Sequence, residues 1–443
     1  MKSRPLVPLL TTTVMLTMVW TSGASAQESP SVPITLDQAI SQAVANSRRL
    51  AELQARGQAA DYAVAGRRAA GRPLVAAQGS YLRTNHVDEF VIAVPGGRPQ
   101  VVYPDIPDNL RARLDLQWPI YTGGRADALE RAARAERTAI GKDLEAAQAD
   151  LRLEVTRAFW AVVTARDTEA LVRRSLEVVN VHVKDVRARL ASGLIPPNDV
   201  SSAAAQASHQ RLLALEASTQ RAIAETDLRR LTGDDRVTAN GGADAHSPAS
   251  SSGAAEMVAA AIKARPERQA LEQRAVAANA RAAAAGAAAR PQIAVGAGYD
   301  YARPNPRIFP RRGDWQTSWD GSVNVTWTLW DGGRKAAEQG EARAGALALE
   351  SRVEDFDRQV AFEVRSRALE LDASREAVSA AEDGVRAATE AERVISERYS
   401  AGVVNGTDVL DAQVARLQAE LDRARAVAGV RLAEARLERA IGR

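Results

Sequence analysis

The side chains best placed to do chemistry are the carboxylates of Asp408 and Asp411. They are three residues apart, and residues at positions i and i+3 lie on one face of a helix. Paired carboxylates attract cations and repel anions, as charged rings do in ion pores. Acidic residues at the start of a helix also stabilise it through the helix dipole, so the residues alone support both interpretations.

The rest of the composition removes most other kinds of site. The chain has 443 residues, no cysteine and four histidines. It therefore has no disulfide, iron–sulfur cluster, zinc–cysteine site or cysteine nucleophile, and no cysteine to carry an N-terminal lipid. Its Gly-Gly-Arg turns lack the spacing of a phosphate-binding loop. We expect no enzymatic activity, no metal and no cofactor.

Residues 1–26 have the three-part pattern of a secretory signal peptide. Lys2 and Arg4 form a positive head, 6–20 is apolar, and Ala24-Ser25-Ala26 is a small-residue cleavage site. The apolar run is shorter than the roughly 20 residues of a membrane-spanning helix, which disfavours an uncleaved anchor, and no later run is that long. Without Lys2 and Arg4, the 58 basic and 55 acidic residues leave a net charge of about +1. Nucleic-acid binders concentrate positive charge, so we expect no nucleic-acid partner.

The chain contains an internal repeat. Segment 116–125 (LQWPIYTGGR) recurs at 325–334 (VTWTLWDGGR), and 189–200 (RLASGLIPPNDV) recurs at 398–409 (RYSAGVVNGTDV), both at an offset of 209 residues. Upstream the offset is 218, so the first repeat has nine extra residues. Their Pro- and Gly-rich surroundings, 88–108, predict an exposed loop. The repeats span 27–240 and 254–443, and a linker spans 241–253.

Proline-free runs with apolar residues three and four apart predict long coiled-coil helices. The first, 125–190, would be about 100 Å long at 1.5 Å per residue, and the second repeat has a counterpart. Each should end in a turn at Gly193 or Gly402, followed by a return helix capped by Asp199 or Asp408. The predicted helical hairpins are about 124–231 and 333–441.

Four runs alternate apolar and polar residues and predict β-strands. The clearest, 110–120, has Arg111, Arg113 and Asp115 on its polar face. Those charges suit a watery lumen, and the opposite faces, with aromatic residues near the strand ends, suit lipid. A small soluble sheet that covers the helices is the alternative. The predicted β-hairpins are about 73–123 and 291–332.

Four strands cannot close a barrel, and unpaired strand edges cannot face lipid. Copies of the chain would have to combine their strands, giving eight from two chains or twelve from three. The long helices would then continue the barrel as a tube of coiled coils.

In these features the chain resembles the TolC-like outer-membrane efflux proteins. The resemblance covers both repeats, the strand pairs that end in Gly-Gly-Arg, and the double Arg-x-x-x-Gly…Asp-Val pattern. It implies a mainly α fold with a membrane β-barrel part. In the family, a homotrimer forms a twelve-stranded barrel in outer-membrane lipid, continued by an α-helical tunnel across the periplasm. It also implies two partners, a periplasmic adaptor and an inner-membrane pump of the RND or ABC type, in efflux or type I secretion.

The resemblance gives roles to residues near the glycine turns. In the family, the aspartates that match Asp408 and Asp411 form the periplasmic channel constriction, and a trimer would bring six carboxylates together. Asp199 and Tyr399 resemble residues that hold neighbouring tip hairpins shut, although Tyr399 would equally fill the helical seam. The family often has arginine at the position of Val404, so one closing link is missing here.

The turns themselves would contact the adaptor's helical hairpin. Left-handed helix caps explain Gly193 and Gly402 fully as structure, and the resemblance adds the adaptor contact. The residues that it assigns to this contact are Arg189, Gly193, Leu194, Arg398, Gly402 and Val403.

Two other classes of protein fit part of the pattern. A trimeric coiled-coil surface or structural protein with a barrel anchor would place its strands at the C-terminus, not twice in mid-chain. A periplasmic adaptor would have a contiguous all-β domain, and none is visible in the sequence. The exported substrate is not encoded in these patterns, because a tunnel passes what its pump delivers.

Overall fold

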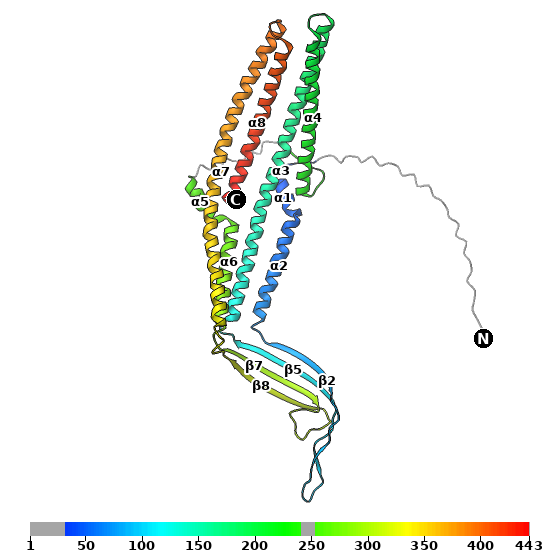
Figure 1. Ribbon diagram of the computed structural model, residues 1–443, viewed down its shortest axis with the longest axis vertical. Coiled ribbons are helices and arrows are strands. Elements are labelled where there is room, and N and C mark those ends of the chain that lie inside the picture. Colours follow the sequence, from blue (N-terminus) through cyan, green and yellow to red (C-terminus); the bar gives the residue numbers. More distant parts are fainter. Residues whose placement is uncertain (1–31, 241–252, 443) are drawn as a thin grey trace, which may run out of the picture.

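The computed structural model describes residues 32–240 and 253–442, which form an elongated, mainly helical molecule with a β-sheet at one end (Figure 1). The predicted signal peptide, 1–26, and nearly all of the predicted linker, 241–253, lie outside the described residues. Among the helices of the described part, none combines the length and the apolar character needed to cross a membrane.

Two long helices dominate the molecule. α3 (Arg125–Ala191) and α7 (Arg334–Ser400) each have 67 residues, or about 100 Å at 1.5 Å per residue. Each follows a glycine with left-handed backbone, Gly124 (φ 87°) or Gly333 (φ 89°). The return helices are α4 (Pro197–Thr232) and α8 (Gly406–Ala440). The two helical hairpins lie beside each other at the end of the molecule away from the sheet.

Shorter helix pairs precede the strands. They are α1 (Leu36–Asn46) with α2 (Arg48–Ala69), and α5 (Ala254–Ala264) with α6 (Pro266–Ala287). Each pair is interrupted by one residue of extended backbone, Ser47 or Arg265. These two residues are 218 positions apart, which repeats the upstream offset of the sequence. The Ser47 hydroxyl accepts a bond from the Leu50 N–H and so starts α2.

A small belt crosses the helices halfway along the molecule. β1 (Val32–Ile34) pairs in parallel with β6 (Val237–Ala239). Beneath it lies the largest apolar core, in which Phe159 and Leu228 are fully buried. Burying such a side chain contributes about 1.5–3 kcal/mol. β6 lies just before the predicted linker, 241–253, in a part of the first repeat for which the sequence predicted no strand.

The sheet has four antiparallel strands in the order β2 (Leu74–Arg83), β5 (Asp108–Tyr121), β7 (Gln292–Arg303) and β8 (Gln316–Thr326). The two repeats meet where β5 pairs with β7. β2 and β8 are the outer strands, each with one unpaired edge. The alternation of apolar residues at Val323, Val325, Trp327 and Leu329 predicts a strand that includes all four, but β8 begins earlier and ends at Thr326. Trp327 and Leu329 therefore follow the strand instead of belonging to it.

The extra residues of the first repeat form more than a loop. They contain a short antiparallel hairpin of β3 (Phe90–Ile92) and β4 (Gln100–Tyr103). Arg311, in the β7–β8 connection, donates a hydrogen bond to the Tyr103 hydroxyl at 2.6 Å. The connections of both repeats are therefore joined at the end of the sheet that lies away from the helices.

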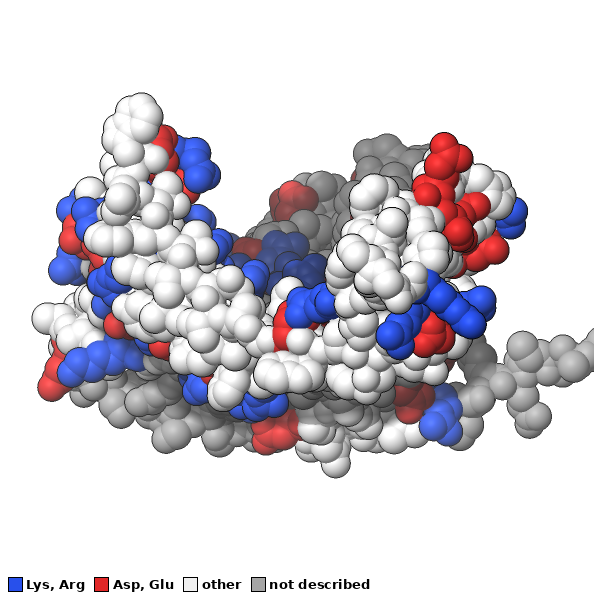
Figure 2. Space-filling model, turned by 90° about the horizontal axis from the view of Figure 1, so that it is seen from below, with Lys and Arg blue, Asp and Glu red and all other residues white. Residues whose placement is uncertain are grey.

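One face of the sheet is apolar and uncovered. Leu114, Tyr299 and Trp319 lie directly opposite one another on β5, β7 and β8, and all three are exposed. Seen from the sheet end of the molecule, wide areas of the surface carry no charged side chain (Figure 2). An apolar face of this extent requires an apolar environment or a partner.

Candidate gate at the helix tips

Both helical hairpins turn in the same way. The Leu194 N–H donates to the Arg189 carbonyl at 3.0 Å, and the second repeat has the same bond from Val403 to Arg398 at 2.9 Å. This bond, from the third residue after the helix back to its last turn, belongs to the Schellman motif. The equivalent sequence segments therefore fold into equivalent turns.

The turns present glycine and apolar side chains to the solvent. Gly193 and Gly402 have φ values of 71° and 75°, a conformation that side chains with a Cβ disfavour. No neighbouring atom lies within 4 Å of a Cβ placed on either glycine. The side chains that follow, Leu194 and Val403, are 73% and 71% exposed. Each turn thus forms a blunt apolar tip.

The predicted helix caps are wrong in detail. α4 starts after Pro196, with proline at its first position, where the fixed φ of proline suits a helix, so Asp199 lies in the first turn and does not cap it. α8 starts after Asn405. The Asn405 side chain accepts from the Asp408 N–H at 2.9 Å, and the Asp408 carboxylate accepts from the Asn405 N–H at 3.1 Å. This capping box makes Asp408 its third helical residue.

The two aspartates of the predicted constriction have different surroundings. Asp408 is half-buried and bonded in the capping box, whereas Asp411 is exposed. Across residues 32–240 and 253–442, Asp411 makes no side-chain hydrogen bond or ion pair. Helix capping therefore accounts for Asp408 and leaves Asp411 without a structural role in the single chain.

A narrow cavity, which we call the tip cavity, lies between the two hairpins near their turns. All four helices contribute to its lining, with His182 on α3, Asp199 on α4, Tyr399 on α7 and Gly406 on α8. Asp199 and Tyr399, which the sequence had paired, thus line one cavity within a single chain. No hydrogen bond joins them in the part of the chain that the structure describes.

The cation that faces Tyr399 comes from the first repeat. The Arg189 guanidinium lies 4.4 Å from the centre of the Tyr399 ring, a cation–π contact, and it is also paired with Asp185 at 3.0 Å. Burial raises the pKa of the Tyr399 phenol, which therefore stays neutral at physiological pH. Arg189, expected only as an adaptor contact, thus supplies a cation where Val404 cannot.

His182 is a tip residue that the sequence analysis missed. Its ring centre lies 5.7 Å from that of Tyr399, and the residue is 8% exposed. Among the residues that the structure describes, its Nε2 atom has no hydrogen-bond partner. Burial lowers the pKa of its imidazole, and the field of Arg189 adds to this while that of Asp185 opposes it. The available signal was a histidine in an apolar seam, three residues after Val179 and four before Val186.

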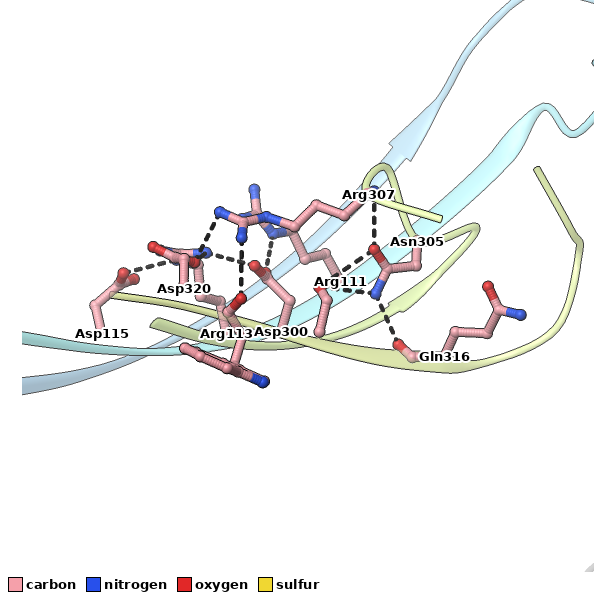
Figure 3. A network of polar contacts seen from close by, with 10 residues as sticks. Arg111, Arg113, Asp115, Asp300, Asn305, Arg307, Gln316 and Asp320 are labelled. Carbon is pink, nitrogen blue, oxygen red and sulfur yellow. Dashed lines mark hydrogen bonds and ion pairs between the residues drawn. The ribbon is translucent and has the colours of Figure 1, made fainter. Parts of the chain in front are cut away.

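A second cluster of charges lies on the polar face of the sheet (Figure 3). Arg113 on β5 is bonded to Asp115 at 2.6 Å, to Asp320 on β8 at 3.0 Å, and to Asp300 on β7. Arg111 donates to Asp300 at 2.5 Å. Asp300 is almost completely buried, so the network ties three strands together across both repeats.

This network changes the interpretation of the charged strand. The sequence suggested only that Arg111, Arg113 and Asp115 face a watery lumen, and the structure adds that all three are paired. Arg307, from the β7–β8 connection, adds an ion pair to Asp320 at 2.9 Å. The network is therefore close to electrically neutral, and it fixes both the strand register and the connection that folds over the polar face.

Comparison with known proteins agrees with this architecture. The family model described as "Outer membrane efflux protein" matches residues 39–234 and 257–443. Among solved structures, a membrane protein from Pseudomonas aeruginosa is 23% identical with a TM-score of 0.79, covering 93% of this chain and 91% of that one. VceC, an outer membrane protein from Vibrio cholerae, is 20% identical with a TM-score of 0.77, covering 92% and 96%. The CmeC outer membrane channel of Campylobacter jejuni is 16% identical with a TM-score of 0.78, covering 98% and 94%. No curated protein matches the chain.

The chain belongs to the outer membrane efflux protein family, because the family model covers most of both repeats. It is therefore an outer-membrane channel protein with a periplasmic tunnel, and it is not an enzyme. The resemblance inferred from the two repeats and their turns is confirmed.

Proposed function

We propose that the chain is the outer-membrane channel of a tripartite export system. It would receive substrates from an inner-membrane pump of the RND or ABC type through a periplasmic adaptor and release them outside the cell. The observation that supports this most strongly is the four-stranded sheet with two unpaired edges and one exposed apolar face. Such a sheet cannot remain open in lipid, because unpaired backbone groups are too costly there.

The open sheet supports a homotrimer. Pairing of β2 in one copy with β8 in the next would satisfy both edges at once. Three copies would give the twelve strands of the family's barrel, with the row of Leu114, Tyr299 and Trp319 facing lipid and the Arg113 network facing the lumen. The helices of three copies would then surround a tunnel on the same axis.

The helix tips support a gate and a docking site at the periplasmic end. Asp408 and Asp411 would form the constriction, and the tip cavity between Asp199 and Tyr399 would hold the hairpins together while the gate is closed. The adaptor would contact the two blunt turns through the residues that the family resemblance assigns: Arg189, Gly193, Leu194, Arg398, Gly402 and Val403.

Purified protein tests the channel directly. The purified protein should show a trimeric mass in detergent and conductance in planar lipid bilayers. In cells, a photoreactive residue introduced at Leu194 or Val403 should cross-link the turns to an adaptor. A photoreactive residue at Tyr62, which is exposed on α2 far from the turns, is the matched control and should not capture the adaptor. A stable monomer or dimer without conductance contradicts the channel. A conducting trimer that captures no adaptor contradicts the tripartite role alone.

A further inference from the structure

We propose that His182 makes the contact between the two helical hairpins sensitive to pH, so that acid loosens the closed tip. This inference rests on the proposed function of the tip as a gate. It concerns a residue on α3 that belongs neither to the pair of Asp408 and Asp411 nor to the exposed turns.

The imidazole is enclosed by both hairpins. A Cβ placed on Gly406, the first residue of α8, would lie 3.5 Å from His182 Nε2 and 3.8 Å from a ring carbon of Tyr399. The start of α8, in the second hairpin, thus lies beside the histidine ring of the first. Even a Cβ at this position would make only ordinary van der Waals contact with the ring. The Nε2 atom, which has no hydrogen-bond partner among the described residues, points to a ring that is accommodated in its neutral form.

The charged groups around the ring do not stabilise the protonated form of His182. They are Asp185 and Arg189 on its own helix, Asp199 on α4 and Tyr399 on α7. α8 contributes only uncharged residues to the tip cavity. Asp185 is already paired with Arg189, which itself disfavours a second positive charge. A protonated His182 would also bring a buried N–H without an acceptor, which is unfavourable.

The direction of the pH effect follows from linkage. In the closed contact, burial lowers the pKa of His182, and a ring released to water would return toward the ordinary value of about 6.5. The open state therefore binds the proton more tightly, and protons shift the equilibrium toward it. The closed contact is unaffected above about pH 6.5 and weakens as the pH falls below that value. Carboxylic acids in general titrate near pH 4, outside this interval.

Planar-bilayer recordings between pH 7.5 and pH 5.5 test this inference. We expect the open fraction of the unmodified channel to rise on acidification, by at most about tenfold per chain of the trimer for each unit by which the pKa is lowered. His182→Phe keeps an aromatic ring but cannot be protonated, so its open fraction should not change over this interval. His209→Phe removes an exposed histidine of α4 and should respond to acid as the unmodified channel does.

Each other outcome has a definite meaning. If His182→Phe still responds to acid, or if the unmodified channel conducts without any response, the inference is wrong. If His182→Phe fails to form trimers, His182→Gln, whose amide stays neutral, is judged by the same criteria. A protein that neither trimerises nor conducts at any pH would instead contradict the proposed channel function.

Discussion

At the scale of single residues, the two tip aspartates separate structural from functional roles. Asp408 caps α8 through Asn405, whereas Asp411 has no such task. We predict that Asp408→Ala with Asp411→Ala raises the single-channel conductance and removes block by divalent cations, because a trimer would lose six carboxylates from one constriction. The alanine at 408 should also destabilise the start of α8 by about 1 kcal/mol. Planar-bilayer recordings with and without divalent cations measure the first effect.

Replacing both aspartates with asparagine distinguishes the effect of their charge from the effect of helix capping. Asp408→Asn with Asp411→Asn removes the same charges, while the amide oxygen at 408 can still accept from the Asn405 N–H. We expect this variant to lose cation block as completely as the alanine pair does. Cation block that persists in the asparagine pair would show that these aspartates only start a helix.

At the scale of elements, the two turns combine local strain with open surroundings. We predict that Gly193→Trp or Gly402→Trp leaves normal amounts of trimer in the outer membrane but abolishes export. A Cβ in the left-handed region costs about 1 kcal/mol, too little to unfold helices of 67 residues, and no neighbouring atom obstructs the new side chain. The indole would, however, occupy the place where we propose that an adaptor hairpin docks. Membrane trimer content and tolerance to an exported compound are the two measurements.

Asparagine provides the matched control for the turns. It tolerates the left-handed conformation better than other residues with a Cβ, and it is much smaller than tryptophan. Gly193→Asn and Gly402→Asn should therefore assemble and export almost normally. Tryptophan variants that export as well as these would show that the two glycines are helix caps without an adaptor contact.

At the scale of the whole molecule, the proposed assembly rests on the edges of β2 and β8 that have no partner strand within the described residues. The chain has no cysteine, so a pair of introduced cysteines reports on one contact without background. We predict that Gln78→Cys on β2, combined with cysteine at Ser318, Ser322 or Asn324 on β8, cross-links neighbouring chains at one of these registers. Denaturing gels should then show covalent dimers and trimers.

The control for this cross-link lies inside one chain. Leu114 and Tyr299 face each other on β5 and β7, so Leu114→Cys with Tyr299→Cys should form a disulfide that leaves the protein monomeric on the same gel. If no pair between β2 and β8 links two chains while the internal pair forms, the proposed barrel closure is wrong.

The sequence by itself determined the elements that depend on neighbouring residues. Apolar spacing of three and four residues, with no proline, gave α3 within one residue of its observed end. Period-two alternation located the four strands of the sheet, and the repeat offset of 209 recurs in the equal lengths of α3 and α7. Backbone periodicity and proline chemistry act over a few residues. Helices and strands can therefore be predicted from the order of residues alone.

Only the tertiary structure decided which side chains meet. Arg113 and Asp300 are 187 residues apart in the sequence, and Arg189 reaches Tyr399 from the other repeat. The short β6 strand is recognisable only through its pairing with β1, and His182 became notable only because the other hairpin packs beside it. These contacts depend on how two hairpins pack side by side, and the free energy of a buried charge or an orphaned donor depends on that packing, which no local pattern encodes.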